Sequence, residues 1–426
     1  MIKIKFLSLT CALFLCGLPS NAQQVLPGHQ PPKPAFPSQT RAPIADQSPA
    51  VDITVIKDGL FLPWGLAPLP SGSLLMSEMT GRLSLVKADG TVTAPLPGLP
   101  PVRGYWFMGL MDILLDPDFK NNRLVYFSYF GPPEGADGNG IHNVTKEWGD
   151  AYVATTALHD EWKVRDAVFL AANPFDRRYI GRGRLADDEM SIENFENIFE
   201  AGARRMTFGS DGKLWVTTWG SGGDSQDPKT VGSKMLRLNP DGSIPADNPN
   251  VGNDQAHDAV YAMGFRDPSG TALNPATGDV WTIEHGPQGG DEINVMKPGA
   301  NYGWPVITYG REYGDDALPV GDGISANADM EQPLYFWNPN IAPSSLMFYT
   351  GDLFPNWKGN VFATSLKMKQ LTRLELSGNN IVAEERLIKH FGERLRTAKQ
   401  GYNGAIYIVT DSRENGQLIK ITPKEN

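Results

Sequence analysis

Two groups of side chains in the C-terminal half of this chain have residue types and a spacing that could do chemistry. The first lies in the segment 284–305, EHGPQGGDEINVMKPGANYGWP, where Gly286 and Pro287 stand in a turn whose carbonyl groups can point outward. This segment and the residues after it also hold three carboxylates, Asp291, Glu292 and Glu312. Ca²⁺ binds about six to eight oxygen atoms of these kinds, so the segment predicts a site for a hard cation. A glycine-rich surface loop with solvated acids is the alternative interpretation.

The second group is basic, and its members are spread over three stretches of sequence: Arg266, Lys367, Arg394 and Arg396. Arg266 lies inside a loop of Gly and Pro residues, GFRDPSG, whereas Arg394 and Arg396 alternate and therefore point to one face of a strand-like stretch. Guanidinium and ammonium groups held in this way suit a ligand with several negative charges. Ordinary surface charge is the alternative interpretation.

The composition limits the possible partners and compartments. Residues 1–22 have the pattern of a secretory signal peptide, in which lysines precede an apolar run that ends in small residues. That run, 6–18, is shorter than the roughly 20 residues that cross a bilayer, so we expect a periplasmic or secreted protein without a membrane anchor. Both cysteines, Cys11 and Cys16, lie in the signal, which excludes disulfides and thiolate sites from the mature protein. The formal charge of −10 argues against nucleic acid as a partner.

The elements that must position these residues are short strands. Residues 23–50 are rich in Pro, Gln and Ser, a linker composition, and no second linker interrupts the body, 51–426. In this body a turn glycine followed by a short apolar strand recurs at 70–78, 209–218, 274–284, 356–365 and 401–410. Several of these units add a second strand, and 121–130 supplies a sixth unit. The pattern predicts an all-β fold, a six-bladed β-propeller with four-stranded antiparallel blades, with a β-sandwich as the alternative.

Longer motifs, in the same order along the chain, resemble the soluble aldose and glucose (sorbosone) dehydrogenases that depend on pyrroloquinoline quinone (PQQ). The motifs include GLMDILLDPDFKNNRLVYFSY, LRLNPDGSIPADNP, GFRDPSG, EHGPQGGDEIN, NYGWP, IAPSS and the C-terminal YIVTD. The resemblance covers about 55 to 424, apart from a poorly matched stretch near 131–200. It implies a six-bladed propeller that oxidises a sugar or related alcohol by hydride transfer to the quinone and passes the electrons to a separate acceptor.

The resemblance also implies roles for particular residues. The tricarboxylate cofactor would meet Arg266, Lys367, Arg394 and Arg396, with Asp267 in place of the family's usual asparagine beside the quinone. One Ca²⁺ ion would bind the carbonyls of Gly286 and Pro287 at the reactive edge of the cofactor. A second, structural Ca²⁺ would bind Glu292, Glu312 and the carbonyl of Tyr302.

The substrate side departs from the family pattern. Alignment places Ala201 at the histidine that removes the hydroxyl proton, Gly220 at the aspartate that orients it, and Phe107 near the sugar-binding glutamine. A base is still required, and the candidates are Asp267, Glu200 and His285. We favour Asp267 as the catalytic base, with Arg266 beside it, although Asp267 could also be an ordinary hydrogen-bonding carboxylate. A Ca²⁺-binding propeller without dehydrogenase activity and a lactonase-like hydrolase are the alternative functions.

Overall fold

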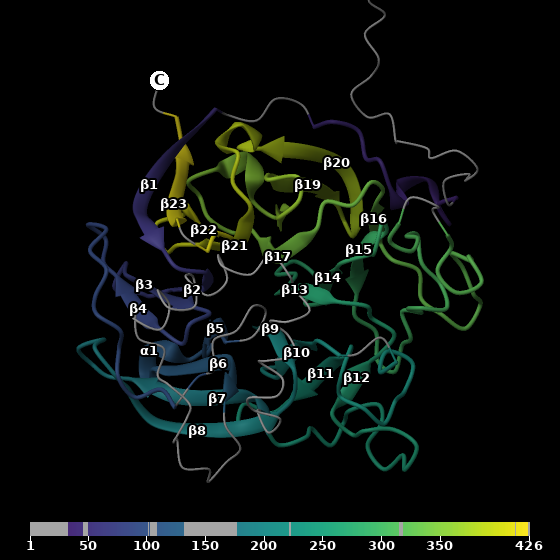
Figure 1. Cartoon of the computed structure of the whole chain (residues 1–426), viewed down its shortest axis with the longest axis horizontal. Helices are drawn as coiled ribbons and strands as arrows, with labels where there is room; N and C mark the ends of the chain where they lie inside the picture. Colours follow the sequence, from purple (N-terminus) through teal and green to yellow (C-terminus); the bar gives the residue numbers. More distant parts are fainter. Residues whose placement is uncertain are drawn as a thin grey trace, which may run out of the picture.

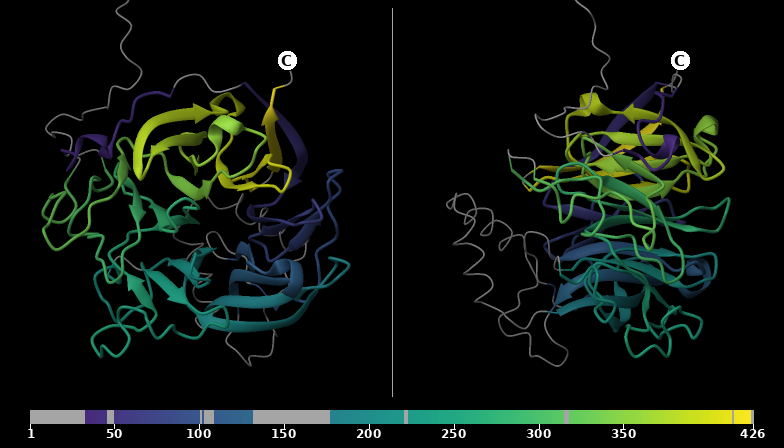
Figure 2. Two further views of the ribbon diagram at one scale, coloured as in Figure 1. Left: turned by 180° about the vertical axis from the view of Figure 1, so that it is seen from behind. Right: turned by 90° about the vertical axis from the view of Figure 1, so that its right-hand side faces the viewer.

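The computed structural model describes residues 33–45, 50–100, 102, 109–131, 177–220, 223–314, 318–413 and 415–424. Within these ranges the chain forms six antiparallel sheets arranged as blades around a central channel (Figure 1). Figure 2 shows the same ring from behind and from its edge. The prediction of an all-β, six-bladed propeller is therefore confirmed. The expected signal peptide, 1–22, and Phe107 lie outside the described residues.

The blades follow one another in chain order. Blade 1 has β2 (Pro63–Pro68), β3 (Leu74–Glu78) and β4 (Leu83–Val86); blade 2 has β5 (Leu110–Leu115), β6 (Leu124–Gly131), β7 (Arg177–Leu185) and β8 (Ile192–Glu200); blade 3 has β9 (Ala203–Phe208), β10 (Leu214–Thr218), β11 (Met235–Leu238) and β12 (Val260–Ala262). Blade 4 has β13 (Pro268–Leu273), β14 (Val280–Glu284), β15 (Asp291–Val295) and β16 (Tyr335–Trp337); blade 5 has β17 (Pro343–Phe348), β18 (Val361–Ser365), β19 (Leu371–Ser377) and β20 (Asn380–Leu387). Blade 6 has β21 (Leu395–Gln400), β22 (Ile406–Thr410), β23 (Gly416–Pro423) and β1 (Val51–Leu60).

Helices are short and lie between strands. They are α1 (Phe119–Asn122) and three 3₁₀ turns, η1 (Pro37–Gln39), η2 (Pro355–Trp357) and η3 (Lys389–Phe391). None of the helices in the described ranges has the length and apolarity of a membrane span. Five sheets have four strands, and blade 1 has three, with an isolated bridge from Val86 to Val92 beside its third strand.

The two ends of the propeller are joined in blade 6. Its three inner strands come from the C-terminus, whereas the outer strand β1 comes from the N-terminus and pairs with β23 from Val51↔Pro423 to Leu60↔Gly416. Closing the ring with strands from both ends leaves no open gap between the first and last blades. The outer strand β1 begins at Val51.

Part of the segment with linker composition packs against the propeller. Gln39 is fully buried, donates to the Pro333 carbonyl at 2.9 Å and accepts from the Tyr309 hydroxyl at 3.0 Å. Farther along, Ile44 forms a parallel bridge with Glu384 of β20. Few apolar side chains are needed here, because hydrogen bonds to blades 4 and 5 hold the segment 33–45.

The core of the molecule is divided among the gaps between blades. Each of the six pairs of neighbouring blades encloses its own apolar cluster, from the one between blades 1 and 2 to the one between blades 6 and 1. Central strands such as β10 and β18 are buried along their whole length, because they pack against a blade on both faces. The turn-and-strand repeats in the sequence correspond to these central strands.

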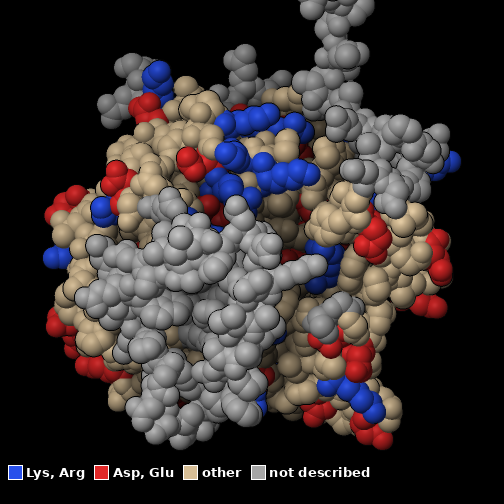
Figure 3. Space-filling view, viewed as in Figure 1, with Lys and Arg blue, Asp and Glu red and all other residues tan. Residues whose placement is uncertain are grey.

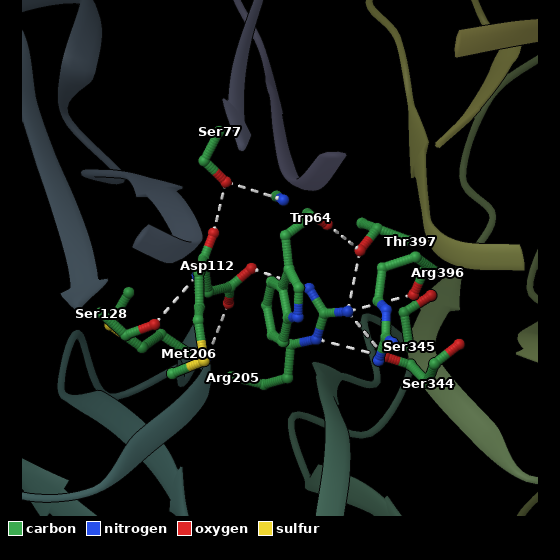
Figure 4. Close-up of polar contacts among 12 residues, drawn as sticks. Trp64, Ser77, Asp112, Ser128, Arg205, Met206, Ser344, Ser345, Arg396 and Thr397 are labelled. Carbon is green, nitrogen blue, oxygen red and sulfur yellow. Dashed lines mark hydrogen bonds and ion pairs between the residues drawn. The ribbon is translucent and has the colours of Figure 1, made fainter. Parts of the chain in front are cut away.

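One buried arginine joins all six blades at the channel axis (Figure 4). Arg205 of β9 is 3% exposed and contacts residues of the five other blades, namely Trp64, Asp112, Ser269, Ser344, Arg396 and Thr397. Its guanidinium forms an ion pair with Asp112 at 3.1 Å and lies 3.7 Å from the centre of the Trp64 ring. The side chain therefore closes the middle of the channel below the pocket described next.

Candidate active site

A pocket of about 390 Å³ lies at one mouth of the central channel. It is lined from blades 2 and 3 by Met111, Phe130, Gly202, Arg204 and Trp219, and from blades 4 to 6 by Asp267, His285, Ala342, Leu366, Arg394 and Arg396. Lys and Arg side chains gather over blades 5 and 6 on the face shown in Figure 3. Residues far apart in sequence meet here because each blade contributes the loops at the end of its strands.

Two of the predicted cofactor residues, Arg394 and Arg396, are held together by one carboxylate. Asp411, just after β22, accepts from Nε of Arg394 at 2.8 Å and from Nη2 of Arg396 at 2.5 Å. Although burial opposes it, the charges of Arg396 and Arg394 lower the pKa of Asp411. The sequence analysis did not single out Asp411, although it is the last residue of the YIVTD motif. The signal for this pairing was an acidic residue at the end of the strand that follows, and pairs with, the strand beginning at the two arginines.

The other two predicted cations stand beside the pocket lining. Arg266 donates to the carbonyl of His285 at 3.3 Å, and its guanidinium lies 5.4 Å from the Trp304 ring centre. Lys367 donates to Oδ1 of Asn340 at 2.5 Å. Neither side chain forms an ion pair with a carboxylate of the described residues. Both positive charges are therefore available to a ligand.

Asp267 lines the pocket and forms an ion pair with Arg204. Its backbone carbonyl also accepts from the backbone N–H of His285 at 3.1 Å. Nε2 of His285 is buried without a hydrogen-bond partner among the described residues. Burial, followed by the charge of Arg204, lowers the pKa of His285 to about 3, so the imidazole is neutral. Three of the predicted pocket residues, Asp267, Arg394 and Arg396, thus meet in one pocket.

The turn that carries Gly286 and Pro287 is held by Asp291. One carboxylate oxygen of Asp291 accepts from the N–H of Gly286 at 2.9 Å, and the other accepts from the N–H groups of Ile341 and Ala342 at 2.6 and 2.7 Å. A side chain at Gly286 would bring Cβ within 2.1 Å of the Gly289 carbonyl oxygen, so only glycine fits. Asp291 therefore shapes the loop, and its carboxylate is occupied by backbone donors.

The Pro287 carbonyl is linked to the cofactor lysine. It accepts from Nδ2 of Asn340 at 3.2 Å, and Oδ1 of the same amide accepts from Lys367. The loop expected to hold a metal ion and the residue expected to hold the cofactor are thus joined by one side chain.

Two buried carboxylates lie next to each other in blade 4. Glu284 of β14 and Glu292 of β15 are directly opposite across the strand pair, and Nδ2 of Asn294 donates to both, at 3.1 and 3.5 Å. Burial raises the pKa of Glu284 to about 8. Burial and the neighbouring Glu284 raise the pKa of Glu292 well above its usual value. Sequence reasoning missed Glu284, although the alternation of strand residues puts it opposite Glu292.

The other two predicted ligands of the structural cation, Glu312 and Tyr302, differ in their exposure. Glu312 is exposed, and no hydrogen bond or ion pair of the described residues joins it to Glu292. Tyr302 is buried, with its ring stacked on Phe265 at 4.8 Å between ring centres. Among the residues that the structure describes, no three His, Cys, Asp or Glu side chains form a group that could hold a metal ion. Any cation bound here would need backbone carbonyls as well.

The pocket wall from blades 2 and 3 is mostly apolar among the described residues. Ala201 is 4% exposed and packs in the apolar cluster between blades 2 and 3. Trp219 lines the pocket, and the guanidinium of Arg178 lies 4.4 Å from its ring centre and 5.2 Å from that of Phe130. Glu200 is exposed and pairs with Arg177, so it stays outside the pocket.

The described lining of the pocket at this mouth of the channel holds three arginines and one carboxylate, Asp267. The Glucose / Sorbosone dehydrogenase family model matches residues 60–420. The chain belongs to this family, which confirms the family predicted from the motifs.

Known relatives cover most of the chain. Aldose sugar dehydrogenase YliI of Escherichia coli (strain K12) is 31% identical over 386 residues, which are 88% of this chain and 93% of that protein. Quinoprotein glucose dehydrogenase B of Acinetobacter calcoaceticus is 25% identical over 428 residues, 86% of each chain. A crystal structure of a glucose dehydrogenase has a TM-score of 0.73 at 34% identity and covers 87% of this chain and 99% of its own.

Proposed function

We propose that this protein is a PQQ- and Ca²⁺-dependent dehydrogenase that oxidises a sugar or related alcohol. The observation that carries the proposal is the set of cations around the pocket. Arg266 and Lys367 have no described carboxylate partner, and Arg394 and Arg396 share a single one, Asp411. A ligand with several carboxylates would offset these charges. The names of the relatives, which include a quinoprotein and an aldose sugar dehydrogenase, support the same conclusion.

The residues present fit a tricarboxylate quinone. Arg266, Lys367, Arg394 and Arg396 would bind its carboxylates, and Asp267 would lie beside its ring. The cofactor supplies an acceptor for the hydride that leaves the alcohol carbon. The chain itself has to hold the cofactor in place, exclude competing anions and orient the substrate hydroxyl.

We propose that Ca²⁺ binds at two places in blade 4. The carbonyls of Gly286 and Pro287 would hold an ion beside the cofactor, where a Lewis acid polarises the carbonyl that receives the hydride. A structural ion would bind Glu292 and the carbonyl of Tyr302, with Glu312 as a further ligand. The buried pair of Glu284 and Glu292 supports the structural site, because two adjacent carboxylates repel each other unless a cation lies nearby.

Removal of the hydroxyl proton falls to this chain, and we propose Asp267 for that role. Among the described residues, it is the one carboxylate that lines the pocket. The adjacent guanidinium of Arg204 favours its ionised form, which is the form that accepts a proton. Arg266, the preceding residue, would hold the cofactor while Asp267 acts on the substrate.

We also propose that the mature protein begins after residue 22 and acts in the periplasm or outside the cell, with a Pro-rich segment, 23–50, ahead of the propeller, 51–426. The lysines and apolar run of the first residues support this proposal. N-terminal sequencing of the exported protein tests it, and an N-terminus at Met1 would contradict it.

The function is tested by reconstitution. Purified apo-protein is titrated with PQQ in Ca²⁺ while the cofactor absorbance is followed, and the loaded protein is then screened against aldoses and simple alcohols with an artificial electron acceptor. We expect stoichiometric uptake of PQQ and turnover of at least one substrate. Uptake of Ca²⁺ without PQQ would indicate a binding module instead, and lactone opening without PQQ would indicate a hydrolase.

A further inference from the structure

Adjacent arginines on β9 have very different surroundings. Arg205 donates hydrogen bonds to Asp112, to backbone carbonyls of blades 4 to 6 and to Thr397. Arg204, the residue before it, donates from Nη1 to Asp267, and its Nε and Nη2 donate to none of the described residues. The Arg204 side chain is only 16% exposed. Nε and Nη2 are not among the fully buried unpaired atoms, so a ligand that enters the pocket can supply them with an acceptor.

Arg204 faces the pocket from the side opposite Arg394 and Arg396. The innermost strands contact one another in the order β2, β5, β9, β13, β17 and β21, so β9 and β21 lie across the channel from each other (Figure 1). Arg394 and Arg396 belong to the β21 side, and Arg266 and Lys367 belong to blades 4 and 5. The pocket wall around Arg204 consists of Met111, Phe130, Gly202 and Trp219.

The described residues of this wall offer few polar groups to a neutral sugar. Its side chains are apolar or aromatic apart from Arg204, and Ala201 and Gly220 carry no polar group. A neutral sugar is bound by several hydrogen bonds to its hydroxyls. A substrate that carries a carboxylate needs fewer of them, because the planar guanidinium binds a carboxylate with two parallel hydrogen bonds.

The charge balance also favours an anion on this side. Burial, followed by the positive charges of Arg396 and Arg205, lowers the pKa of Arg204 to about 9. Arg178, behind Trp219, adds a further positive charge to the same wall. The charge of Asp224, which lies beside Gly220, acts on Arg178. Among the described residues that line the pocket itself, Arg204, Arg394 and Arg396 face one carboxylate, Asp267.

We infer that Arg204 binds a carboxylate group of the substrate, and that the protein therefore oxidises sugar acids or other hydroxy acids in preference to neutral sugars. This inference rests on the proposed dehydrogenase function and specifies its substrate class. A carboxylate of the cofactor is the other possible partner of Arg204. Because the two sources predict different effects of an Arg204 substitution, one set of measurements separates them.

The test compares D-glucose with D-glucuronate, which share the reacting hydroxyl and differ in the carboxylate. For the PQQ-loaded wild type we expect kcat/KM at least tenfold higher for glucuronate. Arg204→Met should lower that value at least tenfold more than it lowers the value for glucose, mainly through KM, with the Kd of PQQ changed less than threefold. In Arg204→Met the carboxylate of Asp267 loses its cation and could itself repel glucuronate. The double variant with Asp267→Asn removes this negative charge, and we expect that it still binds glucuronate weakly. Arg184→Met, on the outer part of blade 2, is the matched control and should change none of these values.

Other outcomes would overturn the inference. A wild type that prefers glucose, or an Arg204→Met variant that loses both substrates equally, contradicts it. A rise in the Kd of PQQ with unchanged KM for glucuronate assigns Arg204 to the cofactor. If the protein takes up no PQQ, the proposed dehydrogenase function fails, and calorimetry still tests this inference. In that case wild type should bind glucuronate at least tenfold more tightly than Arg204→Met, and equal binding would overturn the inference.

Discussion

At the scale of single residues, charge pairing decides what the pocket can bind. Asp411 keeps Arg394 and Arg396 parallel, and the pair of Arg204 and Asp267 occupies the opposite side. Asp267, which lines the pocket, and Asp411, which lies beside it, thus form ion pairs with arginines. The remaining positive charges favour an anionic ligand. A ligand that binds here has to compete with these internal pairs, so changes at one charge should affect affinity measurably.

Replacing Arg394 by Ala should weaken PQQ binding at least roughly tenfold. Loss of one charge-assisted hydrogen bond to a ligand typically costs about 1.5–3 kcal/mol, and Asp411 would then keep only one arginine partner. Titration of the apo-protein with PQQ measures the change. Arg184→Ala, which alters an exposed ion pair on blade 2, is the control. An unchanged Kd for PQQ would remove Arg394 from the cofactor site.

Asp267→Asn should lower kcat by about 10²–10⁴-fold while the Kd of PQQ changes little. A positioned general base contributes a factor of this size, and asparagine keeps the shape of the side chain but accepts no proton. Single-turnover reduction of the bound cofactor measures the step directly. A variant with wild-type kcat would show that another group takes the proton.

Ala201→His should not restore the family's base. The position is 4% exposed within a packed apolar cluster, so an imidazole would have to be accommodated at a cost of about 1–3 kcal/mol. We expect a lower melting temperature and no gain in glucose oxidation. Addition of Gly220→Asp should lower stability further, because Cβ at 220 would lie 2.8 Å from the Gly232 backbone. A gain in activity would contradict this account of the substrate side.

At the scale of elements, blade 4 carries the carboxylates and the turn of the two proposed Ca²⁺ sites. Its strands β14 and β15 hold Glu284 and Glu292 opposite each other, and the turn between them holds Gly286 and Pro287. Asp291, at the start of β15, fixes that turn through three backbone N–H groups. The strand pairing thus places a carboxylate pair and a carbonyl turn at neighbouring positions, which suits hard cations.

Glu292→Gln should have opposite effects on stability with and without Ca²⁺. In EDTA the variant should melt at or above the temperature of the wild type, because it removes one of two adjacent buried carboxylates. With Ca²⁺ the wild type should be the more stable, since an ion at 100 times its Kd stabilises the folded state by about 2.7 kcal/mol. Thermal unfolding in both conditions checks this, with the exposed Glu200→Gln as control. A wild-type melting temperature that is the same in EDTA and in Ca²⁺ would contradict the proposed Ca²⁺ site.

At the scale of the whole molecule, two features hold the ring together. Strand β1 closes blade 6 from the N-terminus, and Arg205 contacts every other blade at the axis (Figure 4). The same guanidinium lies beneath the ligand pocket and hydrogen-bonds the carbonyl of Arg396, a pocket residue. The central contact is therefore expected to support both the fold and the geometry of the pocket.

Arg205→Met should destabilise the folded state by about 3–5 kcal/mol, because it leaves the buried Asp112 without its cation. Adding Asp112→Leu should recover part of the loss, so that the double variant is more stable than the sum of the two single changes predicts. Denaturant unfolding measures the three variants. Additive effects would show that the two side chains do not act as a pair.

The sequence by itself determined the type and number of the repeated elements and indicated most of the basic residues in and beside the pocket. Turn glycines followed by short apolar strands are local patterns, and they correspond to central strands such as β10, β18 and β22. The motifs around Gly286 and Arg394 likewise place their turn carbonyls, acids and arginines within a few residues of each other, so they could be recognised without knowledge of the fold.

Only the tertiary structure decided which charges meet. Arg204 and Arg205 are neighbours of the same type, and nothing local distinguishes them, yet one fills the axis and the other faces the pocket. Their partners, Asp267 and Asp112, belong to different blades, and Asp411 reaches Arg394 and Arg396 through strand pairing within blade 6. Pairings of this kind depend on how six blades pack around one axis, because side-chain alternation fixes only that successive residues face opposite sides of a strand.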